Sequence, residues 1–250
     1  MRVAWEFTQK DIAAVRSAVT AYRDHPIVRD RLTRNLAVSK PAVGRDRFWK
    51  ALTMSLLTTQ QPSGPTSAVT RLLASEPFPL TYRRCCASAD ASAFATKALV
   101  AFGGIRRHGV IGKELAKNLD ALESGLWSEV LNRIEQLRSP TTKDTERSVA
   151  DFLHEKILGL GPKQARNLLQ ALGLTRHEVP LDSRVAKWLR AAGFPVPVTA
   201  AALADRDYYC FVLDGFQRLC SAAKEFPCVV DGAVFASFDS GGWRDDLIRF

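Results

Sequence analysis

The segment of residues 152–189 constrains the fold of this chain more than any other part of the sequence. Apolar residues recur at helical spacing up to Leu158, a Gly-Leu-Gly turn follows, and Pro162 opens a second helix. Proline suits that position because the first residue of a helix has no backbone hydrogen bond to lose. An apolar stripe at positions 165, 168, 169 and 172 continues the second helix as far as Gly173. The sequence therefore predicts two helices joined by a glycine turn, a helix-hairpin-helix.

The turn of this predicted hairpin suits contact with an anion. Gly159 and Gly161 allow the backbone to approach a partner closely, and the N–H groups at the start of the second helix favour negative charge. The chain carries a formal net charge of +9. Because an excess of positive charge favours a polyanionic partner, we expect the anion to be a DNA phosphate.

Two charged side chains accompany the hairpin. Lys163 lies just inside the second helix, and Asp182 follows nineteen residues later, where it is expected to cap a further helix over residues 183–192. With these residues the chain resembles the helix-hairpin-helix (HhH-GPD) DNA glycosylase superfamily, and most of all the type 2 8-oxoguanine DNA glycosylase/AP lyases and endonuclease III. In those families a Gly-x-Gly-x-Lys hairpin carries a lysine nucleophile, and an aspartate faces it across a cleft. The resemblance implies that Lys163 is the nucleophile and Asp182 the catalytic carboxylate.

The resemblance also implies an activity in base-excision repair. Such an enzyme binds double-stranded DNA, flips out a damaged base of the oxidised, 8-oxoguanine-like kind, and removes it. Lys163 would then form a Schiff base with the sugar and cleave the strand, which is AP lyase activity. Two other classes of protein stay open. One is a monofunctional glycosylase for another modified base, with Lys163 as a bystander, and the other is a non-catalytic helix-hairpin-helix module that binds DNA. Taken singly, Lys163 could be a lysine that contacts phosphate, and Asp182 could be a plain helix cap.

Further DNA contacts are expected from two polar turns and from the hairpin. A helix is predicted over residues 47–59, and a polar turn follows it. In the resembled superfamily, a Gln or Asn in the turn after the equivalent helix enters the space left by the flipped nucleotide. An amide suits this role because it can fill the space and form a hydrogen bond with the unpaired base. The glycine-bounded basic loop at residues 102–109 suits a phosphate strand, although a solvated loop is the simpler alternative. The expected DNA-binding residues are Gln60, Gln61, Arg106, Arg107, Gly159, Gly161 and Arg166.

The end of the chain is expected near the base pocket. In the type 2 enzymes C-terminal residues help to hold the oxidised base, so the resemblance places Trp243 and Phe250 in that pocket. Packing of the two aromatic side chains on the core is the alternative. Residues 229–235 resemble the last helix of these glycosylases, in which an aspartate precedes an apolar run.

No metal or organic cofactor is expected. Iron–sulfur members of the superfamily use four closely spaced C-terminal cysteines, whereas this chain has only Cys210, Cys220 and Cys228 there, and it has no CxxC pair. The resemblance leaves room only for a monovalent cation at the hairpin carbonyls. The chain contains no apolar run of membrane-spanning length and begins without the apolar core of a signal peptide. We therefore expect a cytoplasmic, nucleoid-associated monomer with no membrane partner.

Helical periodicity recurs along the chain and strand-like runs are few, so the expected fold class is all-α. The resemblance implies two helical lobes. Residues 46–170 would form a central lobe that ends in the helix-hairpin-helix, and residues 1–45 and 171–250 would together form the second lobe. The hairpin would then lie at the cleft between the lobes, with Lys163 and Asp182 on opposite walls.

Overall fold

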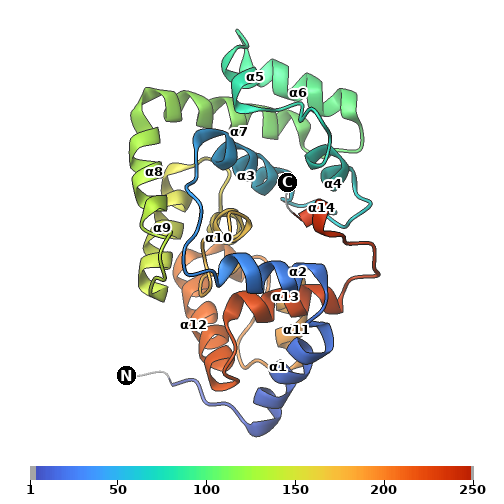
Figure 1. Ribbon diagram of the computed structural model, residues 1–250, viewed down its shortest axis with the longest axis vertical. Coiled ribbons are helices and arrows are strands. Elements are labelled where there is room, and N and C mark those ends of the chain that lie inside the picture. The colour runs from blue at the N-terminus through green and yellow to red at the C-terminus, as the bar shows by residue number, and fades with distance from the viewer. Residues whose placement is uncertain (1–3, 249–250) are drawn as a thin grey trace.

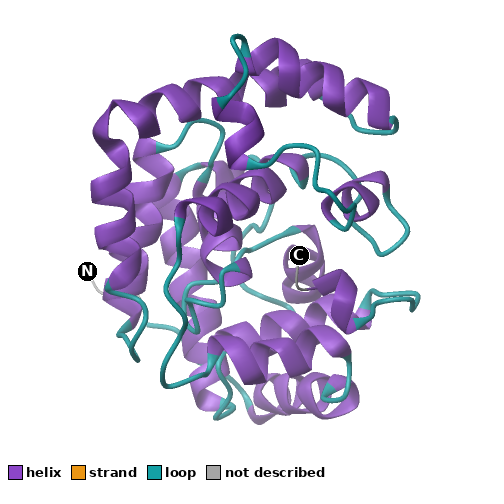
Figure 2. Cartoon of the chain, turned by 45° about the horizontal axis from the view of Figure 1, so that its top comes forward, coloured by secondary structure: helices purple, strands orange, loops and turns teal. Residues whose placement is uncertain are grey.

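The computed structural model describes residues 4–248 as helices joined by loops, with no strand among these residues (Figure 2), so the predicted all-α class is confirmed. No helix in this part of the chain has the length and apolar character needed to cross a membrane. The helices are α1 (Gln9–Tyr22), α2 (Pro26–Asp30), α3 (Arg45–Leu57), α4 (Ala68–Leu73), α5 (Tyr82–Cys86), α6 (Ala91–Phe102), α7 (His108–Ala121), α8 (Trp127–Glu135), α9 (Lys143–Lys156), α10 (Pro162–Ala171), α11 (Ser183–Ala191), α12 (Arg206–Ala222), α13 (Pro227–Ser237) and α14 (Asp245–Ile248), with short π or 3-10 segments η1 (Arg31–Asn35), η2 (Leu122–Leu126) and η3 (Ala202–Ala204).

A polar side chain caps the helix that leads into the hairpin. The hydroxyl of Thr142 accepts a hydrogen bond from Thr145 N at 3.2 Å and starts α9. The first helix of the hairpin therefore begins before residue 152, where the apolar spacing in the sequence begins. It ends at Lys156 rather than at Leu158. Pro162 occupies the start of α10, as predicted.

Buried apolar side chains form two separate clusters. One draws its members from residues 43–174, and the other from residues 15–28 and 179–236. Figure 1 shows the corresponding arrangement: α3 to α7 occupy the upper part of the molecule and α8 and α9 run down its left side, whereas α1 and α2 lie with α11, α12 and α13 in the lower part. We call the elements packed around the first cluster the first lobe and those around the other cluster the second lobe. These clusters support the proposal that residues 46–170 form one lobe and that residues 1–45 and 171–250 form the other.

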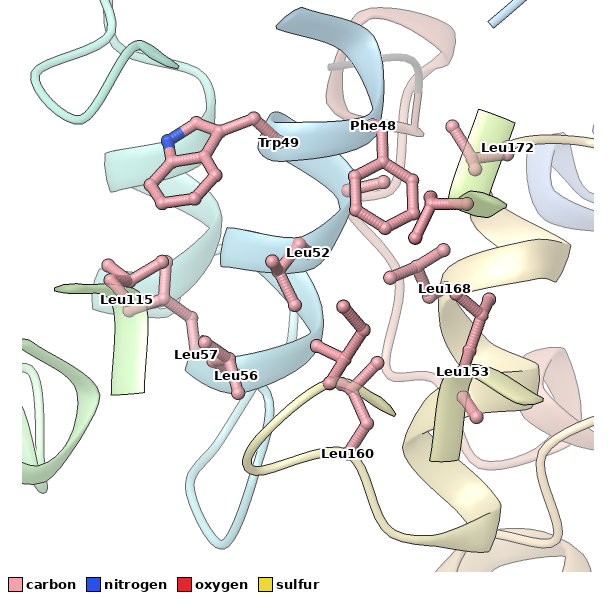
Figure 3. Packing of buried hydrophobic residues seen from close by; sticks show 14 of the residues in the cluster. Phe48, Trp49, Leu52, Leu56, Leu57, Leu115, Leu153, Leu160, Leu168 and Leu172 are labelled. Atoms are coloured by element: carbon pink, nitrogen blue, oxygen red, sulfur yellow. The ribbon is translucent and has the colours of Figure 1, made fainter. Parts of the chain in front are cut away.

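Helix α10 is seen end-on near the middle of Figure 1, and it is held on one side by α3. Phe48, Leu52 and Leu56, spaced four residues apart on α3, are buried in the same cluster as Leu168 and Leu172 of α10 (Figure 3). Burial of a large apolar side chain stabilises a fold by about 1.5–3 kcal/mol. This packing fixes the helix that carries Lys163 against the first lobe.

Arg166 corrects one prediction, because its side chain is completely buried and cannot contact DNA. Its Nε donates a hydrogen bond to Glu178 Oε2 at 2.7 Å, and its Nη2 donates one to Asp151 Oδ1 at 3.1 Å. The guanidinium also lies 4.8 Å from the centre of the Tyr209 ring. The charge of Arg166 is thus required inside the protein, where it neutralises a fully buried carboxylate.

The ion pairs of Arg166 belong to a network that joins the two lobes. Arg147 of α9 approaches Glu178 Oε1 and Asp214 Oδ1, both at 3.0 Å, and Arg206 of α12 pairs with Asp151 of α9. Helices α9 and α10 lie in the first lobe and α12 in the second. The second side of α10 is therefore held by buried charge rather than by apolar packing.

Replacing Arg166 by Met is expected to lower the free energy of unfolding by about 3–5 kcal/mol, because the Glu178 carboxylate would be left buried without its partner. Urea unfolding followed by circular dichroism measures the change. The control is Arg244→Ala, which removes only the exposed ion pair with Asp246 and should leave the stability nearly unchanged. Equal stability of the Arg166→Met protein and the wild type would show that the ion-pair network does not stabilise the contact between the two lobes.

Candidate active site

The hairpin turn between α9 and α10 is held from behind by α7. Leu158 N donates a hydrogen bond to Asn118 Oδ1 at 2.8 Å, and Asn118 Nδ2 donates one back to Leu158 O at 2.9 Å. Asn118 is buried and Leu158 is exposed. The outward face of the turn is therefore formed before any partner arrives.

The two glycines of the turn have different roles. Gly159 has a positive φ of 84°, and a Cβ added there would lie 2.7 Å from Leu56 Cδ2 and 2.8 Å from Glu114 Cδ. Gly161 has an ordinary φ of −72° and serves as the N-cap of α10, and a Cβ there would meet no atom within 4 Å. Gly159 is thus required by the turn itself. Gly161 leaves open space at the start of α10, where an anion is favoured.

Lys163 lies in the first turn of α10 and lines a cavity of about 140 Å³. A cavity of this order, roughly 150 Å³, can hold one aromatic ring. The ammonium donates a hydrogen bond to Gln164 Oε1 at 3.2 Å. Burial lowers the pKa of Lys163, the Asp182 and Asp231 carboxylates raise it, and the Arg184 cation lowers it again. The net lowering favours the neutral amine, which is the form that can act as a nucleophile.

Asp182 lines the same cavity, and it caps α11 as the sequence predicts. Its Oδ1 accepts hydrogen bonds from Arg184 N at 2.8 Å and Val185 N at 3.0 Å, while its Oδ2 lies 3.1 Å from Arg184 Nη1. These donors fix the position of the carboxylate. The structure therefore brings the expected amine and carboxylate to one cavity, each from the start of its own helix.

Asp231 of α13 also lines this cavity, and sequence analysis assigned it no role. Its side chain is only 7% exposed, and burial raises its pKa to about 7. The neighbouring Arg31 cation, the Gln170 amide and the Lys163 cation lower this pKa, whereas the Asp182 carboxylate raises it. One feature of the sequence could have identified Asp231 as a functional residue: it is the single acidic residue within the apolar sequence of α13. An isolated charge in a buried helix is rarely structural.

Aromatic side chains form another part of the cavity wall. The rings of Phe235 and Trp243 meet edge to face with centroids 5.7 Å apart, and the Arg184 guanidinium lies 4.2 Å from the centre of the Phe235 ring. Trp243 is thus on the pocket wall, and its indole Nε1 is buried without a hydrogen-bond partner among the described residues. Phe250, the other aromatic residue expected in the pocket, lies outside the described residues.

The two glutamines of the turn after α3 differ in availability. Gln60 is exposed and has a positive φ of 57°. Gln61 is used inside the protein: its amide oxygen accepts a hydrogen bond from Arg106 N at 2.8 Å, and its amide nitrogen bonds Leu57 O. Gln60 is therefore the glutamine whose amide can reach a partner, while Gln61 joins this turn to the basic loop.

The basic loop before α7 presents one free and one engaged arginine. Arg106 is exposed, whereas Arg107 Nη2 lies 3.6 Å from Glu114 Oε1. Glu114 is also the carboxylate that packs against Gly159 of the hairpin. The loop, the hairpin and the glutamine turn are thus linked through side chains of the first lobe.

Comparisons with known proteins concern the fold. The chain has two helical clusters with the hairpin close to both, and this fold recurs in solved structures. Two solved structures with this fold match the chain: the 8-oxoguanine DNA glycosylase of Thermotoga maritima, with a TM-score of 0.67 and 14% identity over 92% of this chain and 98% of that one, and that of Methanocaldococcus jannaschii, with a TM-score of 0.65 and 12% identity over 92% and 95%. No model of a protein family matches the sequence, and no curated protein does.

The two hairpin glycines provide a matched pair of variants. Gly159→Ala is expected to lower the free energy of unfolding by about 1–3 kcal/mol, because the new Cβ meets Leu56 and Glu114 and the positive φ is strained. Gly161→Ala meets no neighbour and should change stability little. Urea unfolding of both variants tests the difference. If the two substitutions cost the same, the turn geometry described above is not what requires Gly159.

Proposed function

We propose that the protein is a DNA glycosylase of base-excision repair with AP lyase activity. The observation that carries this proposal is that Lys163 and Asp182 line one cavity at the joint of the two lobes. The fold shared with two 8-oxoguanine DNA glycosylases supports the class of enzyme and favours an oxidised, 8-oxoguanine-like base as the substrate. The proposed partner is double-stranded DNA that contains such a base, bound by a monomer in the cytoplasm or nucleoid.

The proposed reaction begins with extrusion of the target nucleotide, because a base inside a duplex cannot be attacked. Cleavage of the N-glycosidic bond builds positive charge on the sugar, which the fixed Asp182 carboxylate would stabilise. The neutral amine of Lys163 would attack C1′ and form a Schiff base, which permits elimination of the 3′ phosphate. Gln60 would fill the space in the duplex, and the backbone at Gly161 would bind a phosphate.

The Lys163→Gln substitution tests the nucleophile. The wild-type protein should be trapped covalently by borohydride on a duplex with an abasic site or 8-oxoguanine, because reduction of a Schiff base leaves a stable amine bond. The variant should give no trapped complex, since an amide cannot form the imine. Gel electrophoresis of the denatured complex measures this. Trapping that persists in the variant would show that Lys163 is not the nucleophile.

Asp182→Asn separates the two roles of the carboxylate. Asparagine is as good an N-cap as aspartate, so the variant should keep its stability and its affinity for DNA. Base release should nevertheless fall by about 10²–10³-fold, because a neutral amide does not stabilise a sugar cation. Single-turnover release from an 8-oxoguanine duplex measures the loss. An unchanged rate would mean that Asp182 is only a cap.

A panel of duplexes with single lesions separates the proposed activity from the two alternatives. A monofunctional glycosylase would release a base yet leave the abasic strand intact until it is treated with alkali. A non-catalytic module would bind the duplexes and release no base from any of them. Strand cleavage without alkali at one lesion is the result expected from the proposed function.

A further inference from the structure

We propose that Asp231 accepts the proton that Lys163 must lose before its amine can attack the sugar. This inference rests on the proposed function, because it assigns a role within the same cavity. It concerns a residue of α13 that lies 68 positions after the lysine in the sequence.

The cavity brings Asp231 to the nucleophile from the opposite lobe. Lys163 comes from α10 in the first lobe, and α13 belongs to the second. Charged and polar groups face the Asp231 carboxyl from each element packed around it. They are Arg31 of η1, Gln170 and Lys163 of α10, Asp182 at the start of α11, Tyr209 and Cys220 of α12, and Cys228 of α13 itself.

Asp182 is poorly suited to take the proton. Its Oδ1 already accepts two backbone N–H groups, and its Oδ2 is paired with Arg184. Both carboxylate oxygens of Asp182 are therefore already engaged. Asp231 has no comparable set of donors: no cation among the described residues forms an ion pair with it within 4.0 Å. Of the two carboxyl groups in the cavity, Asp231 is therefore the one whose oxygens are not already held by an ion pair and two backbone N–H groups.

The electrostatics of the cavity favour the transfer. Model lysine and aspartate side chains have pKa values of about 10.4 and 3.9, so a proton stays on the amine in water. Burial raises the pKa of Asp231 to about 7 and lowers that of Lys163. The difference between the two pKa values is thus much smaller in the cavity than in water. The two side chains form no hydrogen bond or ion pair with each other among the described residues, so we propose that the proton passes through water in the cavity, as general base catalysis allows.

The steps balance without any further reagent. The Lys163 ammonium gives a proton to the Asp231 carboxylate, which leaves a neutral amine and a neutral acid. On an abasic sugar the amine lone pair forms the N–C1′ bond, and the carbonyl electron pair moves to oxygen. That oxygen takes the proton from Asp231 and becomes a hydroxyl. The hydroxyl then takes a second proton from the attached nitrogen and leaves as water, while the nitrogen lone pair forms the C=N bond of a protonated imine. On a substrate with a base, the departing base nitrogen would receive the electron pair and this proton instead.

Borohydride trapping on an abasic duplex, measured against pH, tests Asp231 without any contribution from base recognition. The wild-type rate should rise with pH as Asp231 ionises around neutrality. Asp231→Asn is nearly isosteric and cannot accept a proton, so its trapping should be about 10²-fold slower at pH 7.5 and should rise only at more alkaline pH. Asp231→Glu should restore part of the rate and the limb near neutral pH.

A purely electrostatic role would change the rate in the opposite direction. The Asp231 carboxylate raises the pKa of Lys163, so its removal would leave more neutral amine at pH 7.5. If Asp231 were only a fixed charge, Asp231→Asn would therefore trap faster than the wild type. Faster trapping, or a pH profile that superimposes on that of the wild type, overturns the inference. The second result would leave Asp231 as a residue that contacts the base.

Two controls distinguish this inference from the proposed function. If the wild-type protein forms no trapped complex, the proposed function fails and the inference falls with it. If the wild type is trapped, Lys163→Gln is not and Asp231→Asn behaves as the wild type, only the inference fails. Loss of structure does not explain a slow Asp231→Asn variant if its urea unfolding midpoint at pH 7.5 equals or exceeds that of the wild type. We expect this result because a buried carboxylate with a raised pKa disfavours the folded state above its unfolded pKa.

Discussion

The arrangement of the whole molecule depends on the way in which α10 is held from two sides by two kinds of force. Leucines on one face pack against α3, and Arg166 on another face is bound by Glu178 and Asp151. Apolar packing tolerates small displacements of a helix, whereas a buried ion pair is lost if its partners separate. The first lobe thus provides the bulk of the contact, and the charge network sets where the second lobe sits.

This constraint explains where the candidate site lies. The N-terminal end of α10 follows the exposed residues 158 and 159 of the hairpin turn, and it carries the anion-favouring Gly161 and the amine of Lys163. The second lobe then supplies both carboxyl groups. Asp182 is a cap whose two oxygens already accept hydrogen bonds, and Asp231 lies inside an apolar helix. The amine comes from one lobe and the two carboxyl groups come from the other. Because each lobe is folded around its own core, these groups of opposite charge can be held in one cavity.

The sequence allows the local features to be predicted, and it fails where a side chain depends on a distant partner. The hairpin, Pro162 at the start of α10 and Asp182 as a cap are carried by signals within a few residues, and the structure has all three. Arg166 was expected at DNA because its position on the helix does not reveal that Glu178 faces it. The internal use of Gln61 likewise depends on Arg106, 45 residues away. Asp231 joins the cavity only through the packing of the second lobe.

The hydrogen bond between Gln61 and Arg106 has a consequence for how such a protein would meet a duplex. This hydrogen bond joins two surface loops from different parts of the chain before binding. The two loops would therefore contact the two DNA strands as a single rigid body. Little conformational freedom is then lost on association, and the free energy of contact is not consumed in ordering the loops. The stiffness of the DNA, rather than any folding of the protein around it, would then limit how closely the two molecules fit together.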